Sequence, residues 1–180
     1  MEYDVDVSKA VCGCNAAVYM VSMPETPASA TIDSMGYCDA AGPWGKYCTE
    51  FDIMEANYKA FRAVNHTCDY DDDGKITDGW TRQGPGSPRG WAPCDAWGKC
   101  SVDVNTDFSN PEEIYGPSED AKINTLKPYH VKIDFLEEAD QLANYIITLT
   151  QDGKEVKLDP KPQGGPEAAC PSDNLKKITP

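Results

Sequence analysis

Short runs in which apolar and polar residues alternate recur along the chain and constrain its fold more than any other feature. Residues 2–7 and 130–136 alternate in this way, and residues 143–150 and 154–158 do so on either side of an Asp-Gly pair. Alternation with period two is typical of a strand with one buried face, and Asp-Gly between two such runs indicates a hairpin. No stretch carries the apolar stripe and caps of a long helix. The sequence therefore predicts an all-β protein.

Less regular segments lie between these runs and complete the predicted organisation. Residues 16–23 are continuously apolar, which predicts a strand buried on both faces. Residues 24–47 and 62–113 are rich in Gly, Pro, Asp and Asn, which predicts long loops. A chain of 180 residues fits one domain. We therefore expect a single domain over residues 1–180, in which residues 161–180 form an extended tail.

The cysteine count indicates the compartment in which the protein resides, and the net charge limits the classes of partner it can bind. Eight cysteines are spread along the chain without a CxxC pair, and only two histidines are present, which favours a disulfide framework over a zinc site. That framework and the glycosylation tripeptide Asn65-His66-Thr67 predict a secreted protein. A net charge of −14 argues against a nucleic-acid partner, and no apolar run reaches the length of a membrane span.

Three carboxylates stand close together in the segment CTEFDIMEAN, residues 48–57. On a strand, Glu50 and Asp52 share one face, whereas Glu55 stands at an odd offset and points to the other. One extra residue, a β-bulge between Asp52 and Glu55, would bring all three onto one face. Bulges favour places where a side chain is re-aimed near an active site. The segment therefore predicts a bulged strand.

Carboxylates gathered on one face of a sheet repel one another, and this repulsion does not stabilise a solvent-exposed sheet. A retaining glycosidase needs two carboxyls roughly 5–5.5 Å apart, an ionised nucleophile and an acid kept protonated by its surroundings. Glu50 and Glu55 would form that pair, and Asp52 between them would hydrogen-bond the nucleophile and hold its orientation. The spacing alone fits either this catalytic cluster or a solvated acidic face.

The residues around this segment resemble a known family. EFDIMEAN is similar to the EMDxWEAN signature of glycoside hydrolase family 7, the cellobiohydrolases and endoglucanases that act on cellulose. Five further segments are similar to family motifs in order and approximate spacing: residues 3–23, GYCD at 36–39, His66-Thr67-Cys68, Arg89 with Cys94-Asp95, and Tyr115-Gly116-Pro117. The chain is identified as a much shortened or divergent member of this family.

The resemblance implies a jelly-roll β-sandwich of antiparallel strands with long disulfide-pinned loops and a glucan-binding cleft. It assigns Glu50 as the nucleophile, Asp52 as its orienting partner and Glu55 as the general acid/base, with no cofactor required for catalysis. It also implies residues that contact sugar: His66 beside the acid/base, Tyr19 and Asp39 near the scissile bond, and Arg89 on the product side.

The same resemblance implies a pairing of the cysteines. The expected disulfides are Cys38–Cys48, Cys68–Cys94 and Cys100–Cys170. Cys12 matches a family cysteine whose partner lies far downstream, in sequence that this chain lacks, and Cys14 stands where the family has an apolar residue. Cys12 and Cys14 are therefore expected to be free, bonded to each other, or linked to another chain.

The chain also departs from the family pattern. The family's catalytic domains are far longer, and this chain is similar only to their middle. Met54 replaces the tryptophan of the signature, and Ala41 stands where a glutamine is expected. These departures favour an open-cleft endo-enzyme over a processive one, and leave a glucan-binding remnant and a fragment of a longer chain as alternatives. A homo-oligomer or a second chain would cover the sheet edges left exposed.

Two features stand apart from the family motifs. Residues 69–80, DYDDDGKITDGW, read as the front of a calcium loop, although Trp80 stands where the last acidic ligand is expected. The expected ligands of a structural Ca²⁺ are Asp69, Asp71, Asp73 and Asp78; the alternative is a solvated acidic turn. Trp91, near Arg89, would stack on a sugar ring or pack within its loop.

Together these features predict a secreted, retaining, endo-acting β-1,4-glucan hydrolase with an open cleft, stiffened by Ca²⁺. Its partners would be β-glucan polysaccharides or oligosaccharides, and neither nucleic acid nor a membrane. The alternative is a non-catalytic glucan-binding or cell-surface structural or interaction module built on the same fold.

Overall fold

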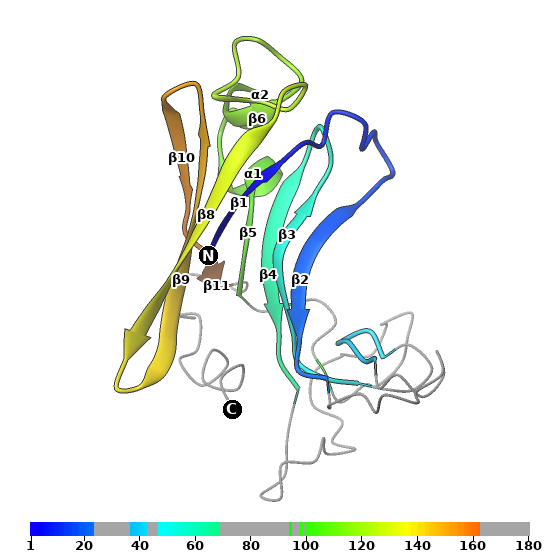
Figure 1. The fold of residues 1–180 in the computed structure, drawn as a ribbon, viewed down its shortest axis with the longest axis vertical. Helices are drawn as coiled ribbons and strands as arrows, with labels where there is room; N and C mark the ends of the chain where they lie inside the picture. Colours follow the sequence, from blue (N-terminus) through cyan, green and yellow to red (C-terminus); the bar gives the residue numbers. More distant parts are fainter. Residues whose placement is uncertain (24–36, 43–46, 69–93, 95–97, 99, 163–180) are drawn as a thin grey trace, which may run out of the picture.

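A computed structural model describes residues 1–23, 37–42, 47–68, 94, 98 and 100–162 of the chain. Within these ranges two antiparallel sheets pack against each other through their apolar faces (Figure 1). In Figure 1, β8, β9 and β10 of one sheet are yellow to orange, and β2, β3 and β4 of the other are blue to cyan-green. The structure is a β-sandwich, which confirms the all-β fold class predicted from the sequence.

The strands follow one another in a simple order within each sheet. In the described residues, one sheet has four strands in the order β1 (Glu2–Val5), β8 (Tyr129–Glu138), β9 (Gln141–Gln151) and β10 (Lys154–Leu158). The other has five, in the order β11 (Lys161–Pro162), β5 (Cys100–Asp103), β4 (Phe61–His66), β3 (Glu50–Ala56) and β2 (Ala16–Val21).

Smaller elements join the sheets at one end. A short parallel pair is formed by β6 (Tyr115–Gly116) and β7 (Ile123–Asn124), and α1 (Val104–Asp107) and α2 (Pro111–Ile114) are single helical turns. No helix in the described residues is long and apolar enough to cross a membrane.

The hairpin between β9 and β10 forms as predicted. Gln151 stands opposite Lys154, so that Asp152 and Gly153 alone make the turn, and both have positive φ angles, 49° and 76°. This is the backbone of a type I′ turn, whose twist matches that of the flanking strands. The buried side chain of Gln151 accepts a hydrogen bond from the Asn124 backbone N–H at 2.7 Å, which ties the hairpin to β7.

Aromatic contacts across the sandwich hold β3 against the opposite sheet. The ring of Phe51 on β3 meets that of Tyr145 on β9 at nearly a right angle, with centroids 4.6 Å apart. Such edge-to-face pairs add about 0.5–1.5 kcal/mol beyond the burial of their surface. Nearer β6, the Tyr115 ring packs edge-on against both Phe61 and Tyr129. These contacts fix which side chains of β3 face inward.

The prediction that residues 16–23 form a strand buried on both faces is wrong in one respect. The strand exists as β2, but it is the last strand of its sheet in the described residues and has only β3 beside it. Tyr19 and Met20 are therefore each 42% exposed. An apolar run signals burial only where strands cover both sides, which the sequence does not reveal.

The prediction of a continuous loop over residues 62–113 is also wrong. That range contains most of β4, all of β5, and the turns α1 and α2. Five of the six residues of β4 are buried, so its two faces do not differ and period-two alternation is lost. Strands covered on both sides lack the pattern by which a half-buried strand is recognised.

The disulfides follow the predicted pairing as far as the described residues reach. Cys38–Cys48 and Cys68–Cys94 are both formed. Cys100 is also disulfide-bonded, and its expected partner, Cys170, lies outside the described residues. Cys12 and Cys14 are exposed and form no disulfide with each other, which removes one of the three expected states.

The glycosylation prediction is wrong for the folded protein. Asn65 lies on β4 and is only 2% exposed, packed inside the sandwich. A glycan requires an acceptor side chain that reaches solvent. The evidence for a secreted protein therefore comes from the disulfides and not from this tripeptide.

Candidate active site

The predicted β-bulge is present in β3. Asp52 stands opposite Val64 of β4 and Glu55 stands opposite Arg62, so β3 advances three residues where β4 advances two. The neighbouring residues Ile53 and Met54 are both fully buried, which is what an extra residue in the strand produces. Asp52 and Glu55 thus lie on the same side of the sheet despite their odd offset.

Glu50 begins the strand and is held by the loop between the disulfide-bonded cysteines 38 and 48. Its Oε2 atom accepts a hydrogen bond from the backbone N–H of Ala40 at 3.0 Å. The Asp39 side chain shapes that loop, because its Oδ1 atom accepts from the backbone N–H groups of Ala41 and Gly42 at 2.8 and 3.0 Å. The loop therefore presents a backbone donor to a half-buried carboxylate.

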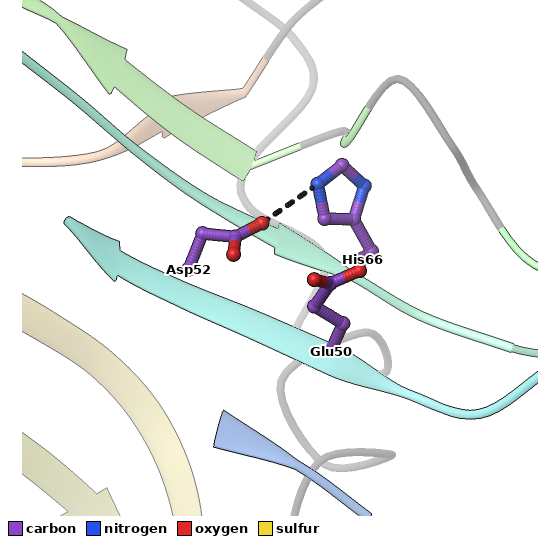
Figure 2. Close-up of side chains that lie close together, drawn as sticks. All are labelled: Glu50, Asp52 and His66. Carbon is purple, nitrogen blue, oxygen red and sulfur yellow. Dashed lines mark ion pairs between the residues drawn. The ribbon is translucent and has the colours of Figure 1, made fainter. Parts of the chain in front are cut away.

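Asp52 forms an ion pair with His66. Its Oδ2 atom lies 3.1 Å from the His66 Nε2 atom, and the two residues are only 5% and 7% exposed. Figure 2 shows this pair, with the Glu50 carboxylate beside the imidazole ring. One potential ligand atom from each of Glu50, Asp52 and His66 lies within 4.8 Å of the other two. The structure thus gathers these three groups into one buried cluster.

Burial sets the protonation of Glu50. Removal from water, and after it the nearby Asp52 carboxylate, raise the pKa of the Glu50 carboxyl to about 7. The Ala40 N–H and His66 act in the opposite sense, because both favour the ionised form. The carboxyl of Glu50 therefore changes charge near neutral pH.

Glu55 lies outside this cluster and has a different partner. Its Oε1 atom accepts a hydrogen bond from the Asn15 side chain at 2.9 Å, and Arg62 stands opposite it on β4. His66, which was expected beside Glu55, forms its ion pair with Asp52. In the antiparallel register His66 stands opposite Glu50, four residues along β4 from Arg62.

A line of hydroxyl groups extends from the same face. Tyr19 on β2 stands opposite Asp52, and its hydroxyl lies 3.0 Å from that of Tyr37. The Tyr37 hydroxyl donates to the Asp39 Oδ2 atom at 3.1 Å. Tyr19 and Asp39, both expected to contact sugar, are thus joined through Tyr37.

Three parts of this site were missed by reasoning from the sequence: Asn15, Tyr37 and the Ala40 N–H. Tyr37 lies inside the GYCD segment, and Asn15 stands immediately before β2, so both were near recognised motifs. Their partners are more than ten residues away in the chain, and only the fold brings them together.

The remaining expected residues lie outside the described part of the chain. These are the sugar-binding candidates Arg89 and Trp91 and the calcium candidates Asp69, Asp71, Asp73 and Asp78.

Comparisons with known proteins agree with this arrangement. The sequence matches the family model described as glycosyl hydrolase family 7 over residues 38–169. It is 31% identical to Endoglucanase 1 of Humicola insolens, over 86% of this chain and 41% of that protein. It is 32% identical to a probable endo-beta-1,4-glucanase celB of Aspergillus terreus, over 74% and 33%. The chain thus spans about two fifths of these relatives, or less.

Solved structures give the same result for the fold. The Humicola insolens endocellulase EGI superposes with a TM-score of 0.68 at 26% identity, over 98% of this chain and 49% of that chain. A GH7 family cellobiohydrolase from Daphnia pulex superposes with a TM-score of 0.65 at 23% identity, over 93% and 45%. The second match bears on the fold alone, and both support the predicted jelly-roll sandwich.

Proposed function

Because the chain belongs to glycosyl hydrolase family 7, we propose that it is a retaining, endo-acting hydrolase of β-1,4-glucan with an open cleft. The observation that carries this proposal is the bulge in β3, which returns Glu55 to the side of the sheet that bears Asp52. The endo-acting relatives named above support the mode of cleavage. The substrate would be a cellulose-like polysaccharide or oligosaccharide.

In the proposed reaction, Glu50 is the nucleophile and Glu55 the general acid/base. The Glu50 carboxylate attacks the anomeric carbon while Glu55 gives its proton to the leaving glycosidic oxygen. Glu55 then takes a proton from water, which attacks the same carbon and releases Glu50. Two inversions retain the configuration, and no cofactor is needed because two carboxyls supply all the proton and bond changes.

The groups around Glu50 would orient it for attack. The Ala40 N–H engages one carboxylate oxygen, which leaves the other for the sugar. Asp52 lies next to it on the strand and is itself fixed by His66. Preorganised donors and charges of this kind favour the transition state because they need no rearrangement during reaction. Tyr19 and Asp39 would hydrogen-bond the sugars that flank the scissile bond.

Two further parts of the proposal concern the whole protein. The disulfides support secretion, because such bonds persist in oxidising compartments. A structural Ca²⁺ on Asp69, Asp71, Asp73 and Asp78 rests on their spacing in the sequence. Melting in the presence and absence of a chelator tests it, and a melting temperature indifferent to chelator would dismiss the calcium site.

The test of the function is hydrolysis by matched variants. Wild type, Glu50→Gln and Glu155→Gln are incubated with carboxymethyl cellulose, soluble mixed-linkage glucan and a fluorogenic cellobioside. Glu155 lies exposed on β10 in the other sheet, so its variant controls for loss of one negative charge. We expect wild type and Glu155→Gln to hydrolyse alike and Glu50→Gln to lose about 10⁴-fold in kcat. Equal rates in all three proteins would contradict the proposal.

One observation favours a second candidate, a non-catalytic glucan-binding or cell-surface interaction module. Apolar side chains such as Met20 and Phe135 are exposed, at 42% and 41%. A second chain or a second copy would cover such surfaces. Oligosaccharide binding by wild type without hydrolysis of any substrate would select this candidate, and the mass of the protein in solution would show whether another chain is bound.

A further inference from the structure

The cluster of Glu50, Asp52 and His66 has a composition that hydrolysis by two carboxyls does not require. It brings an imidazole nitrogen and two carboxylate oxygens within 4.8 Å of one another. The three side chains come from two paired strands, β3 and β4, whose backbones are fixed by the sheet. Figure 2 shows both carboxylates next to the same ring. Rigid elements that bring three ligands to one point make a preorganised site.

The distances fit a small divalent ion. Zn²⁺ binds nitrogen and oxygen ligands at about 2.0–2.2 Å, which places the ligand atoms of a tetrahedral site about 3.3–3.6 Å apart. Asp52 Oδ2 and His66 Nε2 are already 3.1 Å apart. Glu50 is half-buried and has three rotatable bonds, and one of its carboxylate oxygens already lies within 4.8 Å of ligand atoms of both other side chains. The Ala40 N–H holds its other oxygen and does not compete.

We propose that Glu50, Asp52 and His66 form a binding site for a divalent transition-metal ion, with Zn²⁺ as the reference ion. The metal replaces the hydrogen bond between Asp52 and His66, and the proton on the His66 nitrogen that binds the metal is released to solvent. Three protein ligands leave a fourth position for water. An imidazole with two carboxylates suits Zn²⁺ and Cu²⁺. Ca²⁺ is disfavoured at this site because it takes six to eight oxygen ligands and an imidazole nitrogen suits it poorly.

Binding of the ion inhibits hydrolysis, because it occupies the oxygen with which Glu50 attacks the sugar. This consequence rests on the proposed function, whereas metal binding itself does not. The inhibitory ion and the glucan exclude each other, so a saturating oligosaccharide weakens metal binding.

The second histidine of the chain provides an internal control. His130 also lies between carboxylates, with Nδ1 2.8 Å from Asp4 and Nε2 3.2 Å from Glu2. Each of its nitrogens faces a single carboxylate, and the surrounding residues are exposed. Among the described residues, only the cluster at Glu50 brings three such groups together. A general affinity of acidic surfaces for cations would therefore affect His130 as well as His66.

The experiment follows the two imidazole rings during a titration with ZnCl₂. The protein carries Cys12→Ser and Cys14→Ser, because exposed thiols would bind zinc on their own. The ring C–H resonances are recorded by NMR, and the affinity is measured by calorimetry in parallel. We expect one Zn²⁺ per cluster to shift the His66 resonances while those of His130 stay in place. CaCl₂ at the same concentration leaves both rings unchanged.

Variants then assign the ligands. We expect His66→Asn to lower the zinc affinity by more than about tenfold. Loss of a residue that only supports a metal ligand already costs about 10–100-fold in affinity. His130→Asn retains the affinity of the parent protein. If His66→Asn does not fold, Glu50→Gln serves in its place, because the amide keeps the volume but is a poor ligand. Unchanged His66 resonances at saturating Zn²⁺, or equal affinities of parent and His66→Asn, would overturn the proposal.

The two proposals fail in distinguishable ways. If the protein hydrolyses glucan but its His66 resonances do not change with Zn²⁺, the metal site is contradicted and the proposed function is not. A His66 response to Zn²⁺ in a protein that hydrolyses nothing contradicts the function and leaves the metal site standing.

Discussion

The two sheets of the sandwich differ in how regularly they are built. In the sheet of β8, β9 and β10, buried and more exposed residues alternate over residues 129–133 and 155–158, a two-residue turn closes the hairpin, and the register is irregular between Leu136 and Glu137. In the other sheet, β3 carries a bulge and β4 is buried on both faces. The strand residues of the candidate site all belong to this second sheet. The sheet of β8, β9 and β10, called the regular sheet below, acts as a scaffold, and the site lies at the bulge of β3 in the other sheet.

The largest expected effect is the loss of catalysis on replacing a residue of the sheet that carries the site. Glu55→Gln removes the proton donor, and general acid/base groups contribute about 10²–10⁴-fold to rate. We therefore expect kcat on carboxymethyl cellulose to fall by that factor. Glu155→Gln, on the exposed face of the regular sheet, should leave kcat unchanged and alter the free energy of unfolding by less than about 0.5 kcal/mol. A similar loss of kcat in both variants would contradict the distinction between the sheet that carries the site and the scaffold sheet.

The second prediction concerns stability in the regular sheet. Ile147 on β9 is fully buried, between Ile133 and Leu158 on the neighbouring strands. Ile147→Ala leaves a cavity and should lower the free energy of unfolding by about 2–5 kcal/mol, measured by urea denaturation. The fraction that stays folded should keep the wild-type kcat, because no group of the site is touched. A large fall in kcat without loss of stability would argue against a scaffold role.

The third prediction uses the charge on Glu50. Its pKa is raised to about 7 by burial and by the Asp52 carboxylate. The protonated form cannot attack, and a raised pKa means that this form accumulates as the pH falls below about 7. We therefore expect kcat/KM to fall about tenfold for each pH unit below that value.

The variant Asp52→Asn tests the cause of that pH dependence. It removes a negative charge that disfavours ionisation of Glu50. The acidic limb of the kcat/KM profile should therefore move to lower pH, in addition to any fall in the maximum rate. A limb that stays in place or moves to higher pH would show that another group controls it.

The smallest expected effects compare two glycines with positive φ angles. Gly42, at φ 67°, lies in the loop that holds Glu50, and an added Cβ would overlap the Tyr47 ring. Gly153, at φ 76°, lies in the hairpin of the regular sheet with nothing near its Cβ position. Gly153→Ala should cost only the backbone penalty of about 1–2 kcal/mol.

Gly42→Ala should cost more stability than Gly153→Ala and should also lower kcat/KM, because the loop carries the Ala40 N–H that binds Glu50. Thermal unfolding and steady-state kinetics of the two variants measure both effects. Equal effects on stability, with activity unchanged in Gly42→Ala, would show that the loop does not position Glu50.

The sequence predicted the regular sheet well and the irregular one only in part. The turn at Asp152 and Gly153 follows from local backbone preferences, so it could be recognised without the fold. The bulge could be inferred because, on a straight strand, Glu55 would point to the face opposite Asp52. The strand β4 was missed because burial on both faces removes the alternation by which strands are recognised.

The contacts of the site were harder to foresee than its residues. The ion pair of His66 with Asp52 depends on the strand register, which one residue of slippage would change. The contact of Asn15 with Glu55 joins residues forty positions apart. Sequence motifs identify the chemical groups, but long-range packing decides which of them meet.

In the proposed mechanism Glu50, on the bulged strand, forms a covalent bond to the sugar. An activated 2-deoxy-2-fluoro-cellobioside tests it directly, because the fluorine destabilises the oxocarbenium-like transition state and lets the glycosyl-enzyme accumulate. Peptide mass spectrometry then locates the sugar. The account predicts a label on Glu50 that is absent from Glu50→Gln. A label on Glu55 or elsewhere, or none in a protein that still cleaves the fluorogenic cellobioside, would contradict it.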